Sequence, residues 1–426
     1  MFFKMNNYSS NKNNTTIQKI RKDNTKESTQ EFNYNLRYQD PNNEYNIYIE
    51  HLISSNLKLD NIISNKVSLQ IYVEDRVRYY LGDMYDKDIV YPLEEYINVD
   101  VSVNDMETTR KKYPNGVFEN GIYGSNILKM SLYGLKALDK AGLTGYTKRL
   151  LPYFSALKLM NKYFLYLIGD VEKSIDDYYF SKIRLVGCDK CVILKAANLQ
   201  RHWGPLYTKE VFENDIPFEK KKAIAFWRGA TTGQKNRPAN RFDLIEKFFN
   251  KNDKIDVSFS NLAYGTVDTS GNYINYGNYR KYVKGRISIT NQLKYKYLIS
   301  VDGNDKSSSL NWMLACNSLV MMAKPKKLSW LMEDRLIPYV HYIELKDDFS
   351  DLEAKIKWCD DHPYECLQIV KNSTNYMNQF YYEDGERYIE SQVVKRYIDK
   401  INFSKVSFSN NNQVKLIPKR YEYEIN

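Results

Sequence analysis

The chain has 426 residues and a formal net charge of +10, with 62 basic residues interspersed among 52 acidic ones. This length exceeds what one small hydrophobic core organises, so we expect two domains with extensions. No apolar run is long enough to span a bilayer, and the first residues lack the continuous apolar segment of a signal peptide. We therefore expect an intracellular, cytoplasmic protein with a solvated charged surface and no nucleic acid as a partner.

The amino-acid composition of the N-terminal half changes near residue 45. Residues 1–45 are rich in Asn, Lys, Ser and Thr without apolar periodicity, which predicts a disordered or loosely attached arm. Within a predicted α/β domain at 46–216, residues 67–73 alternate like a strand and 125–141 have helical spacing. An apolar strand follows at 161–170. It places the Asp170 carboxylate at the carboxyl end of a strand, where open α/β sheets bind ligands.

The second predicted domain, residues 217–380, alternates regularly between strands and helices. Predicted strands lie at 223–226, 255–259, 297–301, 319–322 and 340–345, and predicted helices at 240–250, 310–317, 328–333, 350–359 and 363–380. Alternation of this kind indicates the α/β class, with a mostly parallel sheet covered on both faces.

A polar turn separates the strand at 297–301 from the helix that begins at Leu310. Its sequence is Gly303-Asn304-Asp305-Lys306-Ser307-Ser308-Ser309, and the helix is predicted because apolar residues recur at helical spacing after it. A helix N-terminus just after a strand favours a phosphate, since unpaired N–H groups and the helix dipole both attract negative charge. The alternative is an ordinary strand–helix turn with a serine cap.

Metal chemistry has little support in the sequence. The five cysteines are an odd number without a secretion signal, which favours reduced thiols. Cys188 and Cys191 form a single CxxC, and no second CxxC or nearby His pair completes a zinc site. Asp86-Lys-Asp88 is a formal DxD, but a three-residue match in a Tyr-rich loop is weak. We expect no metal ion and no other cofactor.

Three segments of the predicted second domain follow one another in a characteristic order. The first is Phe226-Trp-Arg-Gly-Ala-Thr-Thr-Gly233, followed by Arg237 and Arg241; the second is Lys294-Tyr-Lys-Tyr297 with its Gly303 loop; the third runs from Trp330 to Leu345. Together they resemble the signature of family 90 glycosyltransferases. The resemblance covers about residues 163–380. The family includes capsule-associated and lipopolysaccharide-modifying enzymes and protein O-glucosyl- or xylosyltransferases, and the bacterial lipopolysaccharide-type members are the most similar.

The resemblance implies a GT-B architecture, in which two Rossmann-like domains face a cleft. The helix at 381–402 would cross back to the first domain before a tail at 403–426. It also implies inverting, metal-independent transfer of glucose or xylose from a UDP-sugar to a hydroxyl of a glycan or protein.

Asp170 is the catalytic base that the resemblance implies, with Glu172 as the nearest substitute; the alternative for Asp170 is an acid in a surface turn. Cations and N–H donors would stabilise the departing UDP. The candidate substrate-binding residues are Arg228, Gly229, Thr231, Thr232, Arg237, Arg241, Gly303, Asn304, Asp305, Ser307, Ser308, Ser309, Asn311 and Glu333. For Arg228 an equal alternative is a structural arginine paired with an acid, and for Glu333 it is helix capping.

Three positions depart from the family pattern. Gly169 stands where other members often carry Arg, Thr231 where some have a second Arg, and Asn311 near a position that tends to be Lys or Arg. A lost cation weakens phosphate neutralisation unless a neighbouring one substitutes. The competing hypothesis is therefore a catalytically weakened member that binds glycans or nucleic acid.

Overall fold

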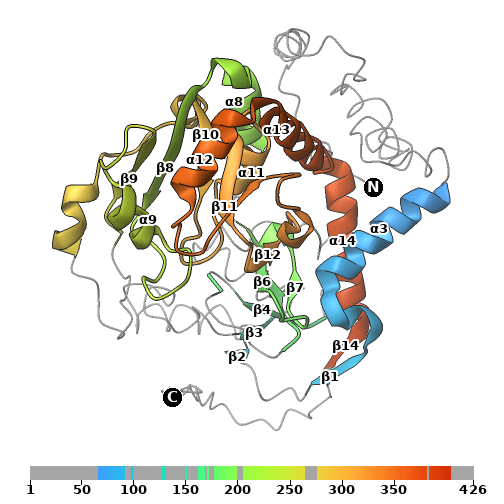
Figure 1. The fold of residues 1–426 in the computed structure, drawn as a ribbon. Coiled ribbons are helices and arrows are strands. Elements are labelled where there is room, and N and C mark those ends of the chain that lie inside the picture. Colours follow the sequence, from blue (N-terminus) through green and yellow to red (C-terminus); the bar gives the residue numbers. More distant parts are fainter. Residues whose placement is uncertain are drawn as a thin grey trace, which may run out of the picture.

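The computed structural model describes residues 66–91, 97–98, 127–130, 150, 153, 162–167, 170–171, 177–198, 205–263, 276–380 and 383–403 (Figure 1). These residues form a mixed α/β structure with two larger sheets, so the predicted α/β class with parallel strands is confirmed. The predicted arm at 1–45 and the tail after residue 403 lie outside the described residues. The division into two domains after residue 216 stays a prediction.

The C-terminal half is built on a five-stranded sheet in which every neighbouring pair is parallel. Its spatial order is β13 (Ile343–Leu345), β11 (Leu319–Ala323), β10 (Tyr295–Ser300), β8 (Lys222–Ala230) and β9 (Ile255–Asn261). When these five strands are numbered along the chain and read from the β9 edge, their order is 2-1-3-4-5. This order is a doubly wound, Rossmann-like arrangement. The chain winds outward in opposite directions from β8 and β10. The topological switch point, where such sheets bind ligands, therefore lies at the carboxyl ends of β8 and β10.

Helices cover this sheet and bury its apolar side chains. They are α9 (Arg241–Phe248), α10 (Ile289–Gln292), α11 (Leu310–Leu314), α12 (Leu352–Asp361) and α13 (Pro363–Asn378), with the 3-10 segments η5 (Phe218–Lys220) and η6 (Tyr276–Tyr282). Helix α9 begins where the Asn240 side chain accepts a 2.9 Å hydrogen bond from the Asp243 N–H. A cap of this type contributes about 1 kcal/mol and fixes the end of the loop that follows β8.

The N-terminal half contains a mixed five-stranded sheet. Its order is β2 (Ile97–Asn98), β3 (Ile127–Met130), β4 (Phe164–Leu167), β5 (Phe180–Ser181) and β7 (Val192–Ile193), with only the β3–β4 pair antiparallel. All four residues of β4 are buried. Asp170 follows β4 and Lys182 follows β5. Because β4 and β5 are parallel, their carboxyl ends place both side chains at the same edge of the sheet.

Two further pairings join segments that are far apart in the sequence. Strand β6 (Ile183–Leu185) pairs antiparallel with β12 (Lys327–Ser329), and β1 (Ile89–Tyr91) pairs parallel with β14 (Ile401–Phe403). Helix α14 (Glu383–Lys400) packs along α3 (Lys66–Leu81), as Figure 1 shows. The remaining elements are η2 (Gly82–Asp86), η3 (Lys195–Ala197), α8 (Pro205–Asn214) and η7 (Glu333–Arg335).

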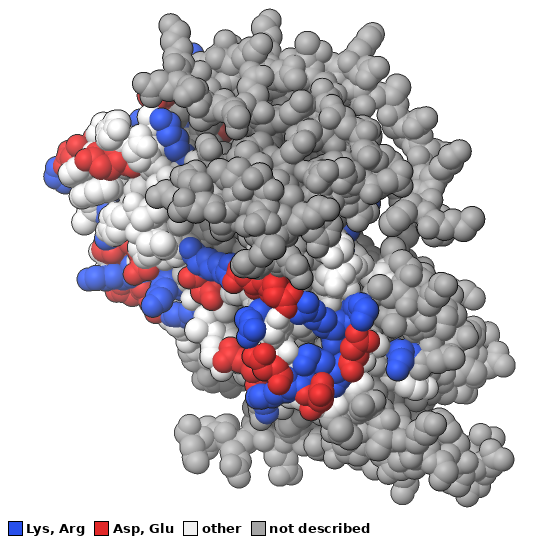
Figure 2. Space-filling view, turned by 90° about the vertical axis from the view of Figure 1, so that its right-hand side faces the viewer, with Lys and Arg blue, Asp and Glu red and all other residues white. Residues whose placement is uncertain are grey.

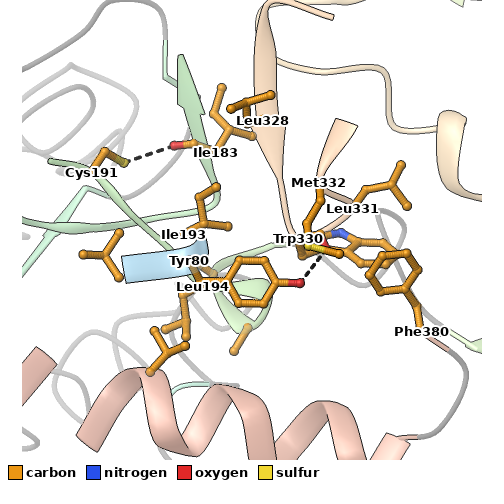
Figure 3. Close-up of a cluster of buried hydrophobic side chains, with 14 of the residues drawn as sticks. Tyr80, Ile183, Cys191, Ile193, Leu194, Leu328, Trp330, Leu331, Met332 and Phe380 are labelled. Carbon is orange, nitrogen blue, oxygen red and sulfur yellow. Dashed lines mark hydrogen bonds between the residues drawn. The ribbon is translucent and has the colours of Figure 1, made fainter. Parts of the chain in front are cut away.

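The two halves share one hydrophobic cluster (Figure 3). Tyr80 of α3 donates a 2.7 Å hydrogen bond from its hydroxyl to the Trp330 carbonyl. The Trp330 ring meets Phe380 edge-on at 5.1 Å between centroids. This core ties α3 to the segment after β12, so the edge that carries Asp170 is held close to the C-terminal sheet.

A buried ion pair locks α14 to α3. Arg76 contacts the two carboxylate oxygens of Glu386 at 2.6 and 3.1 Å, and Lys195 adds a 2.9 Å contact. Burial would raise the pKa of Glu386, but the charges of Arg76 and Lys195 lower it to about 2.

Three local predictions are wrong. Residues 67–73 lie in helix α3 and not in a strand. The helical period becomes visible only when the sequence is read as far as residue 81, with buried residues at Val73, Val77, Tyr80 and Leu81. Residues 127–130 form strand β3 instead of helix, and the rest of the predicted helix at 125–141 lies outside the described residues. The predicted helix at 328–333 begins as β12, because its partner β6 is too distant in sequence to be foreseen.

The surface drawn in Figure 2 carries both signs of charge. On its described residues, Lys and Arg side chains alternate with Asp and Glu. Among the described helices, none is both long enough and apolar enough to cross a membrane.

Candidate active site

The turn after β8 and the loop after β10 meet at the switch point of the sheet. The Gly233 N–H donates a 2.8 Å hydrogen bond to Oδ1 of Asn304. A Cβ atom on Gly303 would lie 2.9 Å from Thr232 Oγ1 and 3.0 Å from Arg241 Nη2, and Gly233 has a φ of +94°. Only glycine fits such close contact or such a backbone conformation without strain. The structure thus brings the two predicted substrate-binding segments together.

Arg241 fastens these two segments to each other. Its guanidinium donates to the carbonyls of Ala230, Val301 and Asp302 at 3.0, 3.2 and 3.0 Å, and to Thr232 Oγ1 at 2.6 Å. Burial lowers its pKa to about 10, and the guanidinium remains charged at neutral pH. Four of its hydrogen bonds go to protein oxygens, so Arg241 shapes the site more than it serves a ligand.

Two other cations converge on the Asn304 carbonyl. Arg237, which is half-buried, donates to it at 3.0 Å, and Lys327 approaches it at 3.4 Å. Lys327 also donates a 2.8 Å hydrogen bond to the Asp305 carbonyl, and its ammonium lies 3.8 Å from Asp302. Burial lowers the pKa of Lys327. The sequence pointed to Arg237 but not to Lys327, which lies in strand β12.

The other predicted residues of the β8 turn face the protein interior. Arg228 forms a 2.8 Å ion pair with Asp256, and its side chain is only 4% exposed. This geometry corresponds to the structural alternative. Thr231 is fully buried and accepts a 2.7 Å hydrogen bond from the Ala263 N–H. A Cβ atom on Gly229 would lie 2.5 Å from the Trp227 ring.

The serine-rich end of the β10 loop is held by its own side chains. Asp302 accepts a 2.9 Å hydrogen bond from the Ser307 N–H, and the Ser307 and Ser309 hydroxyls lie 3.2 Å apart. Ser308 is half-buried in the same turn. Helix α11 has only five residues, and Ser309 makes no side-chain cap. The serine cap of the alternative is therefore not formed at Ser309. So short a helix has a weak dipole, and the phosphate seat at its N-terminus stays a prediction.

Asn311 and Glu333 lie deeper than expected for residues that bind a sugar donor. Asn311 is 5% exposed, and its Oδ1 has no hydrogen-bond partner among the described residues. Glu333 accepts 2.6 Å hydrogen bonds from both the N–H and the hydroxyl of Ser329, and Lys306 lies 3.8 Å away. Burial raises the pKa of Glu333. Its carboxylate holds the turn after β12, but Ser329 is a strand residue, so this contact is not the helix capping of the alternative.

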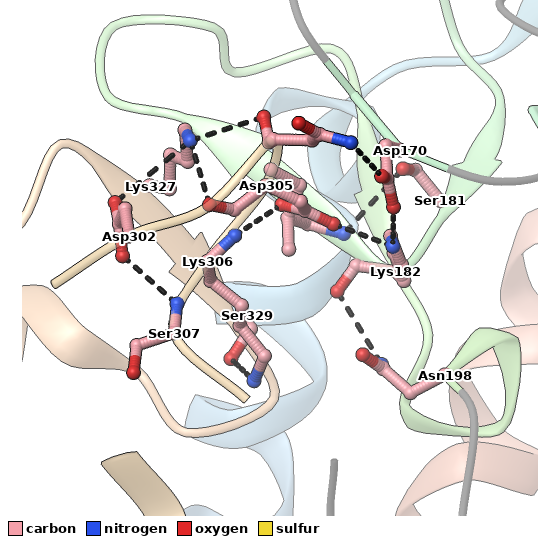
Figure 4. Close-up of polar contacts among 12 residues, drawn as sticks. Asp170, Ser181, Lys182, Asn198, Asp302, Asp305, Lys306, Ser307, Lys327 and Ser329 are labelled. Atoms are coloured by element: carbon pink, nitrogen blue, oxygen red, sulfur yellow. Dashed lines mark hydrogen bonds and ion pairs between the residues drawn. The ribbon is translucent and has the colours of Figure 1, made fainter. Parts of the chain in front are cut away.

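Asp170 reaches this site from the N-terminal sheet. Its Oδ1 lies 2.5 Å from Lys182 Nζ, and its Oδ2 accepts a 3.3 Å hydrogen bond from Asn304 Nδ2 (Figure 4). The Asp170 side chain is 38% exposed, so a substrate hydroxyl can reach it. The substitute base Glu172 and the neighbouring Gly169 lie outside the described residues. Lys182 was missed, because nothing in the sequence predicted the two-residue strand β5 that precedes it.

The sequence features that suggested metals have other roles. Cys188 and Cys191 are buried and unbridged, and burial raises the pKa of Cys191 to about 12. Asp86 forms a 3.0 Å surface ion pair with Arg78, while Asp88 is 86% exposed. Within the described residues, no group of three or more His, Cys, Asp or Glu side chains is arranged to hold a metal ion.

Comparison with known proteins gives the family. Residues 196–416, just over half of the chain, match the model of glycosyl transferase family 90. The chain belongs to this family, which confirms the resemblance found in the sequence and makes glycosyl transfer its class of function.

The relatives include proteins from bacteria and animals. The O-glucosyltransferase LpsA of Dichelobacter nodosus is 29% identical over 252 residues, which cover 59% of this chain and 70% of LpsA. Protein O-glucosyltransferase 2 of Danio rerio is 28% identical over 213 residues, or 48% of this chain and 38% of that protein. Human protein O-glucosyltransferase 1 is 24% identical over 213 residues, or 49% of this chain and 50% of that protein.

Proposed function

We propose that this chain is an inverting, metal-independent transferase of GT-B type that uses a UDP-sugar. It would move glucose, or alternatively xylose, to a hydroxyl of a glycan or protein. The observation that carries the proposal is the contact between Asp170 and Asn304. This contact joins an acid at the end of a strand in the N-terminal sheet to the loop at the switch point of the C-terminal sheet.

The donor side of the proposal rests on the switch point. Doubly wound sheets bind nucleotides at the carboxyl ends of their strands, and here these ends carry the Gly233 turn and the Gly303 loop. A UDP leaving group develops negative charge that needs cations or N–H donors. Arg237 and Lys327, which both lie against the Asn304 carbonyl, are the cations that we assign to this task.

The acceptor side rests on Asp170. In the proposed step, Asp170 takes the proton from the acceptor hydroxyl while that oxygen attacks the anomeric carbon. The bond from this carbon to the UDP oxygen breaks, and UDP leaves with the electron pair. Oδ2 of Asp170 accepts a long 3.3 Å hydrogen bond from Asn304, and we assign it as the oxygen that accepts the proton.

The choice of sugar rests on the relatives. The bacterial and animal proteins named above are called O-glucosyltransferases, which supports glucose as the transferred sugar. The alignments with the two animal relatives cover half of those proteins or less. The acceptor is therefore proposed only as a hydroxyl of a glycan or protein.

The test is nucleotide release from UDP-glucose and UDP-xylose by the purified chain, with and without EDTA, together with UDP binding by calorimetry. Asp170→Asn should lower turnover by about 100-fold or more and leave UDP affinity nearly unchanged, because a general base acts on the chemical step. Asp189→Asn, a change of an exposed acid in the same half, should behave as wild type.

Three outcomes would count against parts of the proposal. A wild-type chain that binds no UDP contradicts the function as a whole. UDP binding without release from either sugar nucleotide favours the alternative of a weakened family member that acts as a binding protein. Equal losses of turnover and UDP affinity in Asp170→Asn would show that Asp170 is not the base.

A further inference from the structure

Lys182 is buried between two carboxylates that come from different halves of the molecule. Its Nζ lies 2.5 Å from Asp170 Oδ1 and 2.7 Å from Asp305 Oδ2. The side chains of Lys182 and Asp305 are 1% and 5% exposed, while that of Asp170 is 38% exposed. We call these three residues the Asp170–Lys182–Asp305 bridge; Figure 4 shows it in place.

The inner end of the bridge is held firmly. The Lys182 carbonyl accepts a 3.4 Å hydrogen bond from the Asn198 amide, and the strand β6 that follows pairs with β12. Asp305 accepts a 2.7 Å hydrogen bond at Oδ1 from the Lys306 N–H, and its own carbonyl accepts the 2.8 Å bond from Lys327. The backbone of Lys182 and the Asp305 side chain are thus held in place on the buried side. Of the three side chains in the bridge, that of Asp170 is the one open to substrate.

We propose that Lys182 is a positioning residue for Asp170, and that Asp305 keeps the Lys182 charge compensated while Asp170 gains and loses its proton. This inference rests on the proposed function, in which Asp170 is the base. A buried ammonium without a partner is strongly unfavourable. If Asp170 were the sole anionic partner of Lys182, each protonation of Asp170 would leave the buried ammonium without a counter-charge. With Asp305 present, a neutral Lys182–Asp305 pair remains.

The two partners of Asp170 act on its protonation in opposite directions. The nearby Lys182 cation favours the charged carboxylate, whereas the Asp305 anion favours the protonated form. Burial raises the pKa of Asp305, the Lys182 charge opposes this, and the Asp170 charge adds to it. Lys327, on the side of Asp305 away from Lys182, donates to the Asp305 carbonyl and is the next charged group beyond the bridge. Removing Lys182 or Asp305 should therefore shift the titration of Asp170 in opposite senses.

The experiment measures kcat/KM for UDP-sugar consumption against pH in the full chain. Lys182→Met should move the acidic limb of the profile up by about one pH unit, because a carboxylate that loses a neighbouring cation is protonated more easily. Asp305→Asn keeps the shape of the side chain and should move the limb down. The double variant should lie near wild type. Lys182→Arg retains the cation and should keep the wild-type limb.

A second measurement separates this inference from the proposed function. The ¹³C signal of the Asp170 carboxyl, assigned by its loss in Asp170→Asn, can be titrated without any substrate. Opposite shifts in the two single variants support the bridge even in a chain that does not turn over a UDP-sugar. Equal or absent shifts overturn it even in an active enzyme. Should Lys182→Met fail to fold, Asp305→Asn and the double variant carry the same comparison.

Discussion

Asn304 donates from Nδ2 to Oδ2 of Asp170 at 3.3 Å, although the two residues belong to different sheets. The same side chain accepts the 2.8 Å hydrogen bond from Gly233 at Oδ1. One amide group therefore connects the turn after β8, the loop after β10 and the acid after β4. We therefore expect a displacement of the loop that we assign to the donor to shift the acid that we assign to the acceptor.

The Gly303→Ala variant should weaken UDP binding. An added Cβ would lie 2.9 Å from Thr232 Oγ1 and 3.0 Å from Arg241 Nη2, so the loop must move away from the β8 turn. We expect the Kd for UDP to rise about tenfold, which corresponds to about 1.4 kcal/mol. Calorimetric titration with UDP measures this change.

Gly187→Ala is the control for Gly303→Ala. Gly187 has a φ of +86° in an exposed turn, and nothing lies within 4 Å of an added Cβ. The substitution should cost about 1 kcal/mol of stability through backbone strain and leave the Kd unchanged. An unaltered Kd in Gly303→Ala would mean that the donor does not occupy the contact between the two loops.

The two arginines of the first motif should respond differently to the same substitution. Arg237→Gln removes a charge that we assign to the diphosphate, and UDP affinity should fall about tenfold. Arg228→Gln breaks the buried pair with Asp256, so the free energy of unfolding should fall while UDP affinity stays the same. Calorimetry and urea denaturation on both variants distinguish the two roles. The reverse pattern would assign the phosphate contact to Arg228.

The sequence predicted the two loops of the candidate site, because the signals for the strands before them are local. The apolar runs before Gly229 and Gly303 mark strands β8 and β10, and both loops were named as substrate-binding segments. The role of each arginine was not predictable, because it depends on partners far along the chain: Asp256 for Arg228, and the Val301 and Asp302 carbonyls for Arg241. Lys182 was missed because strand β5 before it was not predicted, and because its partner Asp305 lies far along the chain.

The fold was predicted best in the C-terminal half, where strands are long and regularly spaced. In α3 the alternation of residues 67–73 resembled a strand, and tertiary packing against α14 determined the outcome. Strand β7 falls within a short strand predicted at 191–194, whereas the two-residue strand β5 is too short for a periodic pattern. The pairing of β5 with β4 and with β7 forms the edge that carries Asp170.

Glu386→Gln should destabilise the packing of α14 on α3. The substitution leaves Arg76 and Lys195 buried without their anionic partner, and we expect the free energy of unfolding to fall by about 3–5 kcal/mol. Asp86→Asn breaks the pair with Arg78, whose side chain is 55% exposed, and should change stability by less than about 1 kcal/mol. Urea denaturation compares the two. Similar small effects would mean that the buried pair does not hold the helix.

Acid should destabilise the wild type more than the Glu386→Gln variant. The pKa of Glu386 falls from an ordinary 4.5 to about 2 in the folded chain. The ionised Glu386 therefore contributes its full stabilisation above the pKa of the unfolded chain. This stabilisation is lost as the pH falls through the pKa of the folded chain. The loss between those pH values amounts to about 3 kcal/mol for a shift of this size. The free energy of unfolding of the variant is subtracted from that of the wild type at each pH. This difference removes the contributions of the other titrating groups, including Glu390, whose raised pKa acts in the opposite sense. A difference that stays constant with pH would show that the pKa of Glu386 is the same in the folded and the unfolded chain.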